Sequence, residues 1–379
     1  GSIFLFGFAL FIKKKNLSTF LKKKNLLYLL VIFFLLPMFI SQKYHEDFGY
    51  YHLPYSLAFL EEKIVFGFSN IDQSFVYNSI WLNLNSIFFL KNKNFNLQTL
   101  PVFLLFIGFV IFSINKILEK KQIKISDYYL TTILFYFLLK FTRISEFGVD
   151  FPAVIFSVLS IFYFIKFYET NENSKRKSFF YLNLTFSIFS ILIKLSTLPV
   201  FILTIYLYFS NFRNFKFYIF NYKFLIIYFL CLVFFIQQFI YTGCFLFPTN
   251  FTCLNVSWFN IDYLNLSKQL ELTNKSYSEA KNIYSPEEYL SNFKWFSFWI
   301  KRNSIEIIEH LMTIILPILI FIFVLKKEKK NTLILKNKLV LFFFVVFSLL
   351  FWLNFSPVFR FAIYIFVTLI FLIFLNIFI

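Results

Sequence analysis

Apolar runs of about 20 residues recur along this chain and constrain its fold more than any other feature. Segments such as Leu100–Ile114 and Leu339–Leu353 are apolar on every face of a helix. A soluble domain could not bury so much apolar surface, because 59% of the 379 residues are hydrophobic and 25% are aromatic. A β-barrel strand would instead alternate with a period of two. The runs therefore predict an all-α, polytopic transmembrane helical bundle.

The pattern predicts about 10–11 spans in a single transmembrane domain, residues 1–379. The expected spans are Ile3–Ile12 (partial), Leu26–Ser41, Leu97–Ile117, Asp127–Thr142, Phe151–Tyr168, Phe179–Lys194, Thr197–Ser210, Tyr222–Tyr241, Ser304–Leu325, Leu339–Asn354 and Phe361–Ile379. Two long polar insertions separate them, a first loop at 42–96 with two interfacial helices and a second loop at 243–303. A hinge at Lys194–Pro199 is needed to divide 179–210 into two short spans.

The formal net charge of +18 is best explained by membrane topology. In a soluble protein such a charge would indicate binding to nucleic acid, but short cytoplasmic loops of membrane proteins also carry excess Lys and Arg. If successive linkers alternate between the two sides of the membrane, five basic linkers fall on the same face. They hold Lys13–Lys15 with Lys22–Lys24, Lys116–Lys124, Lys166–Lys177, Arg213–Lys223 and Lys326–Lys338. We therefore expect no nucleic-acid partner, and we expect both long insertions on the outer face.

Cysteine usage in the second outer loop leaves two alternatives open. Cys244 and Cys253 lie on the side of the membrane where disulfides persist, whereas Cys231 lies within a span. Because spacing alone cannot show the geometry of a bond, both a disulfide and two free thiols are consistent with the sequence.

Known nucleotide-binding and hydrolase motifs are missing from the sequence. It contains no P-loop, no dinucleotide glycine fingerprint, no zinc-ligand spacing and no nucleophile elbow. The inner loops are also too short for a catalytic domain. Nucleotide-sugar chemistry on the inner face is therefore not expected.

The densest polar cluster follows the first full span, at residues 44–55 (Tyr-His-Glu-Asp-Phe-Gly-Tyr-Tyr-His-Leu-Pro-Tyr). Ionisable side chains at a membrane interface are costly to hold without a use. A carboxylate there can accept a proton from a hydroxyl, or hold a metal ion, if its surroundings tune its pKa. The alternative is a solvated helix end with an aromatic belt of Tyr50, Tyr51 and Tyr55.

Several short patches resemble the GT-C superfamily of integral membrane glycosyltransferases, in particular a bacterial branch with an acidic residue before a Tyr-His-Leu-Pro segment. The patches are Asp47 with Tyr51–Tyr55, Val65–Asn70, Asn78–Trp81, Glu146–Pro152, Lys194–Ser196, Thr242–Pro248 and Pro357–Phe361. The resemblance implies a GT-C-like fold in the bacterial inner membrane. It also implies transfer of a sugar from a polyprenyl-phosphate donor to an acceptor on the outer, periplasmic face.

The resemblance also implies which residues act. The catalytic acidic residue of the first outer loop would be Asp47, with Glu46 as a close competitor. Cations near the interface would bind the phosphate of the donor, a task that suits the planar fork of Arg. The candidates for this role are Arg360, Arg143 and Lys194, and the supporting residues are His52, Glu146, Asp150 and Asn70. No cofactor is assigned with certainty, and a divalent cation at the carboxylates is an option.

Each candidate cation also has a purely structural interpretation. Arg360 could end a span or extend to the interface. Arg143 could form a local network with Glu146 and Asp150. An unpaired Lys194 would be costly among apolar residues, so a lipid phosphate or a protein carboxylate is expected beside it.

Two functions other than transfer remain open from the sequence. A transporter or flippase of lipid-linked glycans could use the same cations to hold phosphate without forming a bond. Transporters often contain repeated halves with broken helices at matching positions, and no such halves are visible here. The other alternative is a noncatalytic subunit with a GT-C-like fold.

Overall fold

The computed structural model describes residues 23–40, 47–62, 64–89, 95–118, 124–140, 148–212, 221–260, 262–324 and 332–378. Within these ranges the chain forms helices and no β-strand, so the predicted all-α class is confirmed. The predicted N-terminal helix at Ile3–Ile12 lies outside these ranges.

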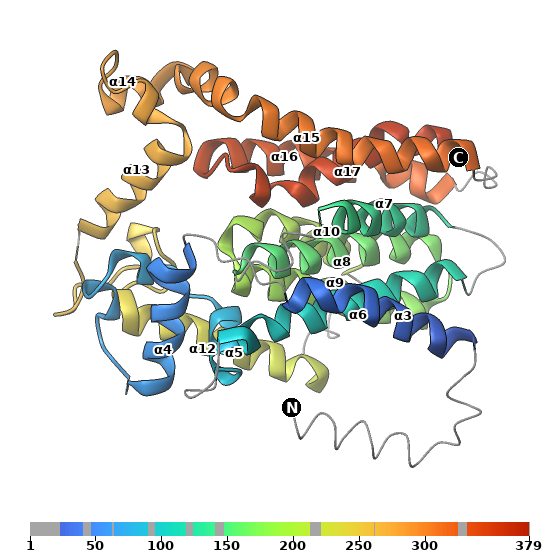
Figure 1. Cartoon of the computed structure of the whole chain (residues 1–379), viewed down its shortest axis with the longest axis horizontal. Helices are drawn as coiled ribbons and strands as arrows, with labels where there is room; N and C mark the ends of the chain where they lie inside the picture. The colour runs from blue at the N-terminus through green and yellow to red at the C-terminus, as the bar shows by residue number, and fades with distance from the viewer. Residues whose placement is uncertain are drawn as a thin grey trace.

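Long helices make up most of the described chain (Figure 1). They are α3 (Lys23–Ile40), α6 (Leu100–Leu118), α7 (Ile125–Leu139), α8 (Asp150–Glu169), α9 (Asn173–Ile193), α10 (Phe201–Ser210), α12 (Leu225–Thr242), α15 (Trp295–Val324), α16 (Thr332–Phe355) and α17 (Ile363–Phe378). Short elements fill the connections between them. Those used below are η1 (Phe48–His52), α4 (Leu53–Glu61), η2 (Phe68–Asn70), η3 (Gln73–Val76), α5 (Ile80–Ile87), η6 (Leu195–Val200), α13 (Asp262–Asn274), α14 (Pro286–Leu290) and η12 (Phe359–Phe361).

Four helical segments are long and apolar enough to cross a membrane, and they lie at Leu97–Ile117, Asp150–Glu169, Tyr222–Thr242 and Lys338–Phe355. Shorter apolar helices lie at Asn25–Pro37, Ile125–Leu139, Leu195–Ser210 and Ile363–Leu375. These segments support a membrane protein with several helices able to span a bilayer. The full number of spans remains a prediction.

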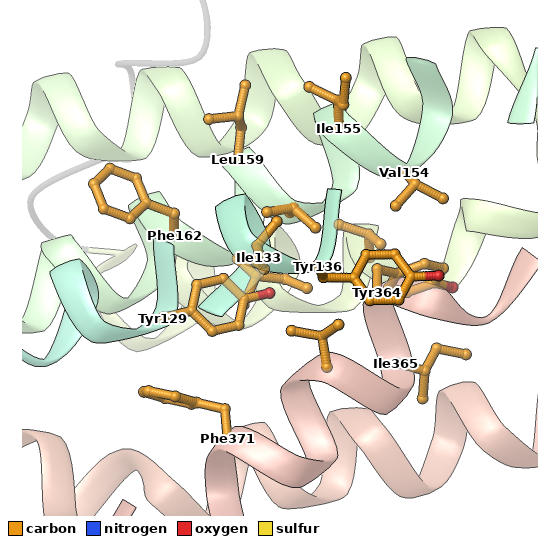
Figure 2. Close-up of a cluster of buried hydrophobic side chains, with 14 of the residues drawn as sticks. Tyr129, Ile133, Tyr136, Val154, Ile155, Leu159, Phe162, Tyr364, Ile365 and Phe371 are labelled. Carbon is orange, nitrogen blue, oxygen red and sulfur yellow. The ribbon is translucent and has the colours of Figure 1, made fainter. Parts of the chain in front are cut away.

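The core lies where α7, α8 and α17 meet. Figure 2 shows side chains from all three helices directed into this interior, and they include Tyr129, Ile133, Tyr136, Val154, Ile155, Leu159, Phe162, Tyr364, Ile365 and Phe371. In the most apolar stretch of each candidate span, 83% of α8 is buried but only 22% of α12. A helix that is apolar all round and buried belongs to the centre of a bundle. Helix α8 is therefore central, and α12 is peripheral.

Hydrogen bonds show that basic connections gather at one end of the bundle. The backbone N–H and hydroxyl groups of Ser126 both donate to the Glu169 carboxylate, at 2.6 Å each, which joins the start of α7 to the end of α8. The Tyr181 hydroxyl donates to the carbonyl of Lys223, which joins α9 to the segment before α12. The described ends of three basic linkers therefore lie at this end of the bundle.

The first long insertion lies at the other end. The Ser79 hydroxyl donates to the carbonyl of Ile193 at 2.8 Å, and the Ser69 hydroxyl donates to the carbonyl of Tyr241 at 2.7 Å. These bonds attach the first insertion to the ends of α9 and α12. Helices α4 and α5 occupy it, where two interfacial helices were expected, and α13 and α14 of the second insertion extend beyond the bundle on the same side in Figure 1.

The predicted break near Lys194 is present. Helix α9 ends at Ile193, Lys194 has an extended backbone, and η6 leads into α10. The Thr204 hydroxyl bonds both Asn183 and Ser187, so α10 returns antiparallel along α9. The segment is a hairpin of two helices rather than one long span.

Helix α15 is longer than the span expected at Ser304–Leu325. The second loop was expected to run to Asn303, but α15 begins at Trp295. No Gly or Pro interrupts this stretch, and the Trp299 indole donates to the carbonyl of Pro357 at 2.7 Å. This packing continues the helix beyond its apolar part.

Candidate functional site

Four charged side chains meet at the end of the bundle that carries the long insertions. Arg360 Nη2 lies 3.3 Å from Asp47 Oδ2, and Arg360 Nε lies 2.9 Å from Asp150 Oδ2. The Lys194 ammonium group pairs with the other oxygen of Asp150. We call Asp47, Asp150, Lys194 and Arg360 the charge quartet. Its members come from four separate parts of the chain, and 313 positions separate Asp47 from Arg360.

Local structure explains how each member is presented. Asp47 immediately precedes η1, and its backbone is already helical. Asp150 lies in the first turn of α8, where the helix dipole favours a negative charge. Lys194 is the extended residue of the α9–η6 hinge, and Arg360 is the central residue of η12.

An aromatic ring holds the two cations together. Lys194 Nζ lies 3.1 Å from the centroid of the Phe361 ring, and Arg360 Cζ lies 5.4 Å from the same centroid. Cations are attracted to the face of an aromatic ring, so Phe361 offsets part of the repulsion between them.

The quartet has no net charge, and it is partly accessible. About a fifth to a third of each side chain is exposed: 30% for Asp47, 28% for Asp150, 19% for Lys194 and 29% for Arg360. Charges at this depth are screened less than surface charges but can still be reached from outside. A ligand with a negative charge can therefore compete with the carboxylates for the cations.

The π-helical turn η1 places two further side chains beside the quartet. His52 is 3% exposed, and its ring lies 4.2 Å from the ring of Tyr51 between centroids. Burial lowers the pKa of His52 to about 4, although the carboxylates of Asp150 and Asp47 act in the opposite direction. Burial, together with the same two carboxylates, raises the pKa of Tyr51. Both side chains are therefore neutral near pH 7.

A family model described as a domain of unknown function, DUF8201, matches residues 2–367. The chain belongs to this family. No curated protein and no solved structure matches it significantly. The DUF8201 match covers all four members of the charge quartet.

Five of the predicted site residues of this DUF8201 chain lie close together in the structure, and one lies apart from them. Asp47, His52, Asp150, Lys194 and Arg360 form one neighbourhood. Asn70 belongs to a different contact, because its amide donates to the carbonyl of Trp258 at 3.0 Å. Three predicted residues, Glu46, Arg143 and Glu146, lie outside the described ranges.

Two questions that the sequence left open now have structural answers. Lys194 pairs with a protein carboxylate, that of Asp150. Cys244 and Cys253 form a disulfide, and Cys231 is a free thiol.

The three tyrosines considered as an aromatic belt occupy different environments. Tyr50 is 75% exposed, Tyr51 is partly buried and Tyr55 is 2% exposed. Tyr55 packs against Phe68 and Phe75 of η2 and η3 within the first loop. Tyr55 therefore stabilises the folded loop, and the three tyrosines do not share one environment.

The described part of the chain contains no group of three or more His, Cys, Asp and Glu side chains that could hold a metal ion. The two quartet carboxylates both contact Arg360, which is a cation itself. The described residues do not fit a divalent cation, so no metal ion is given a role in the reaction.

Sequence reasoning missed a polar network between the first loop and α12. The Tyr55 hydroxyl donates to Asn78 at 2.7 Å, and the Gln237 amide donates to the Tyr55 hydroxyl at 3.1 Å. Asn83 in turn donates to Gln237 at 2.8 Å. Adjacent glutamines at 237 and 238, inside an otherwise apolar span, were the signal that could have revealed this network, because amides in a membrane need partners.

Proposed function

We propose that this DUF8201 protein is a glycosyltransferase of the bacterial inner membrane. It transfers a sugar from a polyprenyl-phosphate donor to an acceptor hydroxyl on the outer face. In this proposal Asp47 is the general base, and Arg360 and Lys194 bind the donor phosphate. The observation that carries the proposal is the contact between Arg360 and Asp47, in which a carboxylate lies beside a guanidinium.

The reaction requires both kinds of group in one place. The acceptor oxygen forms a bond to the anomeric carbon, and the bond from that carbon to the phosphate oxygen breaks. The polyprenyl phosphate leaves with the bonding electrons, and Asp47 takes the proton of the acceptor hydroxyl. Arg360 and Lys194 stabilise the negative charge that develops on the leaving phosphate.

The present pairing also explains how the cations would be held before the donor binds. Arg360 and Lys194 are kept in position by Asp47 and Asp150, so little reorganisation is needed when phosphate arrives. A guanidinium carries five N–H donors in a planar fork and can pair with a carboxylate and a phosphate at once.

The test is transfer from polyprenyl-phosphate sugar in liposomes, with donor binding measured in parallel. Asp47→Asn keeps the size of the side chain but removes its basicity, and we expect the turnover rate to fall about 100-fold or more. Donor binding should survive or strengthen, since Arg360 loses a competing carboxylate. Arg360→Ala should instead weaken donor binding about tenfold or more. Asp262→Asn, an exposed carboxylate at the start of α13, is the matched control.

The outcomes separate the alternatives. Unchanged transfer in both Asp47→Asn and Glu46→Gln would overturn the catalytic assignment. A flippase would retain translocation in Asp47→Asn. A wild-type protein that transfers no sugar from any polyprenyl-phosphate donor would favour the flippase or the noncatalytic subunit.

A further inference from the structure

A cavity of about 310 Å³ lies between α4 and α12, and the charge quartet contributes no residue to its lining. Its walls are mostly apolar and include Ala58, Phe59, Val65, Val233 and Ile240. This volume is at the lower end of the range of about 300–1,000 Å³ that is usual for small-molecule sites.

The cavity has a polar side. Asn83, Gln237 and Tyr241 line it, and Gln237 donates to the Tyr241 hydroxyl at 3.0 Å. The Asn83 amide also donates a hydrogen bond to the Gln237 amide, and Gln237 donates to the Tyr55 hydroxyl. Amides and hydroxyls both donate and accept hydrogen bonds, so this side matches a neutral polar group rather than an ion.

The polar side of the cavity is unusual because part of it comes from α12, a helix that is otherwise apolar. Its two adjacent glutamines point in directions about 100° apart on the helix. Gln238 is buried and donates to the carbonyl of Val76, so it attaches the first loop to α12. Gln237 instead faces the cavity. Asn83, Tyr55 and Tyr241 hydrogen-bond the Gln237 amide, and these contacts hold it at the wall of the cavity.

The cavity opens toward the apolar surface of α12. Val233 and Ile236 line it and are 39% and 45% exposed. Helix α12 is the candidate span with the least buried surface, so this opening faces the region that lipid chains would occupy. At its edge lies the carboxylate of Glu62, which disfavours an anionic headgroup.

We propose that this cavity binds a membrane lipid with an uncharged headgroup that carries hydroxyl or amide groups. The acyl chain of the lipid lies against Val233 and Ile240, and the headgroup hydrogen-bonds Asn83, Gln237 and Tyr241. The site is independent of the transfer reaction proposed above. It depends only on the amide pair and on the opening beside α12.

Photo-crosslinking of the full chain in phosphatidylcholine nanodiscs tests the proposal. The probe is a diacylglycerol with a diazirine in one acyl chain, and labelling of residues 225–242 is measured by mass spectrometry. We expect saturable labelling that excess dioleoylglycerol removes and that dioleoylphosphatidate, with the same chains, does not. Asp47→Asn should leave this labelling unchanged, so failure of the proposed transfer would not be confused with failure of this site.

Two matched variants on α12 distinguish the cavity from ordinary lipid contact. Val233→Phe fills the cavity and should reduce saturable labelling about tenfold, whereas Leu232→Phe, exposed on the same helix but outside the lining, should not. Gln237→Leu should abolish the preference for diacylglycerol over phosphatidate. Equal labelling of the two Phe variants, or stronger competition by phosphatidate than by diacylglycerol, would overturn the proposal.

Discussion

At the scale of single residues, Asp150 is the centre of the candidate site. It contacts both Lys194 and Arg360, and it therefore balances two cations that would otherwise repel one another. Of the two cations in the quartet, Asp47 contacts only Arg360 in the described structure. Asp150 thus has the stronger structural role, and Asp47 is better placed for chemistry.

Burial of His52 predicts a loss of stability in acid. The pKa of His52 is about 4 in the folded protein and about 6.5 in an exposed histidine. As the pH falls below 6.5, the unfolded chain binds a proton that the folded protein does not, so folding becomes less favourable. We expect a loss of about 2 kcal/mol between pH 7 and pH 5.

The measurement is thermal unfolding in detergent across this pH range. His52→Gln removes the titrating group and should flatten the dependence of Tm on pH. Parallel pH profiles for wild type and His52→Gln would contradict the assignment of this loss to His52.

At the scale of secondary-structure elements, the α9–α10 hairpin positions Lys194. The hairpin is joined by side chains rather than by backbone pairing, as expected of helices in an apolar setting. Asn183 on α9 donates to Ser160 of α8 at 2.9 Å and accepts from Thr204 of α10 at 2.8 Å. One buried amide therefore connects three helices.

Asn183→Ala should destabilise the protein by about 1–2 kcal/mol, because it leaves buried partners on α8 and α10 without their hydrogen bonds. Thr185→Ala is the matched control on the same helix. The Thr185 hydroxyl bonds only the preceding turn of α9, at Tyr181, and its loss should cost less than about 0.5 kcal/mol. Equal losses of Tm in the two variants would show that the amide does not join the helices.

At the scale of the whole molecule, the long insertions and the basic connections lie at opposite ends of the bundle. Glu169 at the end of α8 and Lys175 at the start of α9 lie at one end of the bundle. Asp150 at the start of α8 and Lys194 after the end of α9 lie at the other. Excess Lys and Arg favour the cytoplasmic side, so the quartet is expected to face outward.

Cysteine labelling tests this orientation. In a Cys231→Ser background, Lys281→Cys should react with a membrane-impermeant maleimide on intact cells, and Lys175→Cys should react only after permeabilisation. Both positions are exposed, and the paired Cys244 and Cys253 have no thiol to react. Labelling of both variants on intact cells would refute the predicted topology.

The helical class, the approximate helix positions and the break at Lys194 could be predicted from the amino-acid sequence. Length and apolarity of a run are local properties, and they dictate a helix wherever backbone groups cannot reach water. The sequence also singled out the members of the quartet, but by resemblance and not by any spacing between them.

The contacts between these residues, in contrast, depend on how the helices pack. The contact between Asp47 and Arg360 joins residues 313 positions apart, and no periodicity predicts it. The early start of α15 and the orientation of Gln237 toward a cavity likewise depend on what packs against each helix. Partners of buried polar groups come from other elements, so the local pattern predicts that a partner is needed, and packing decides which one is present.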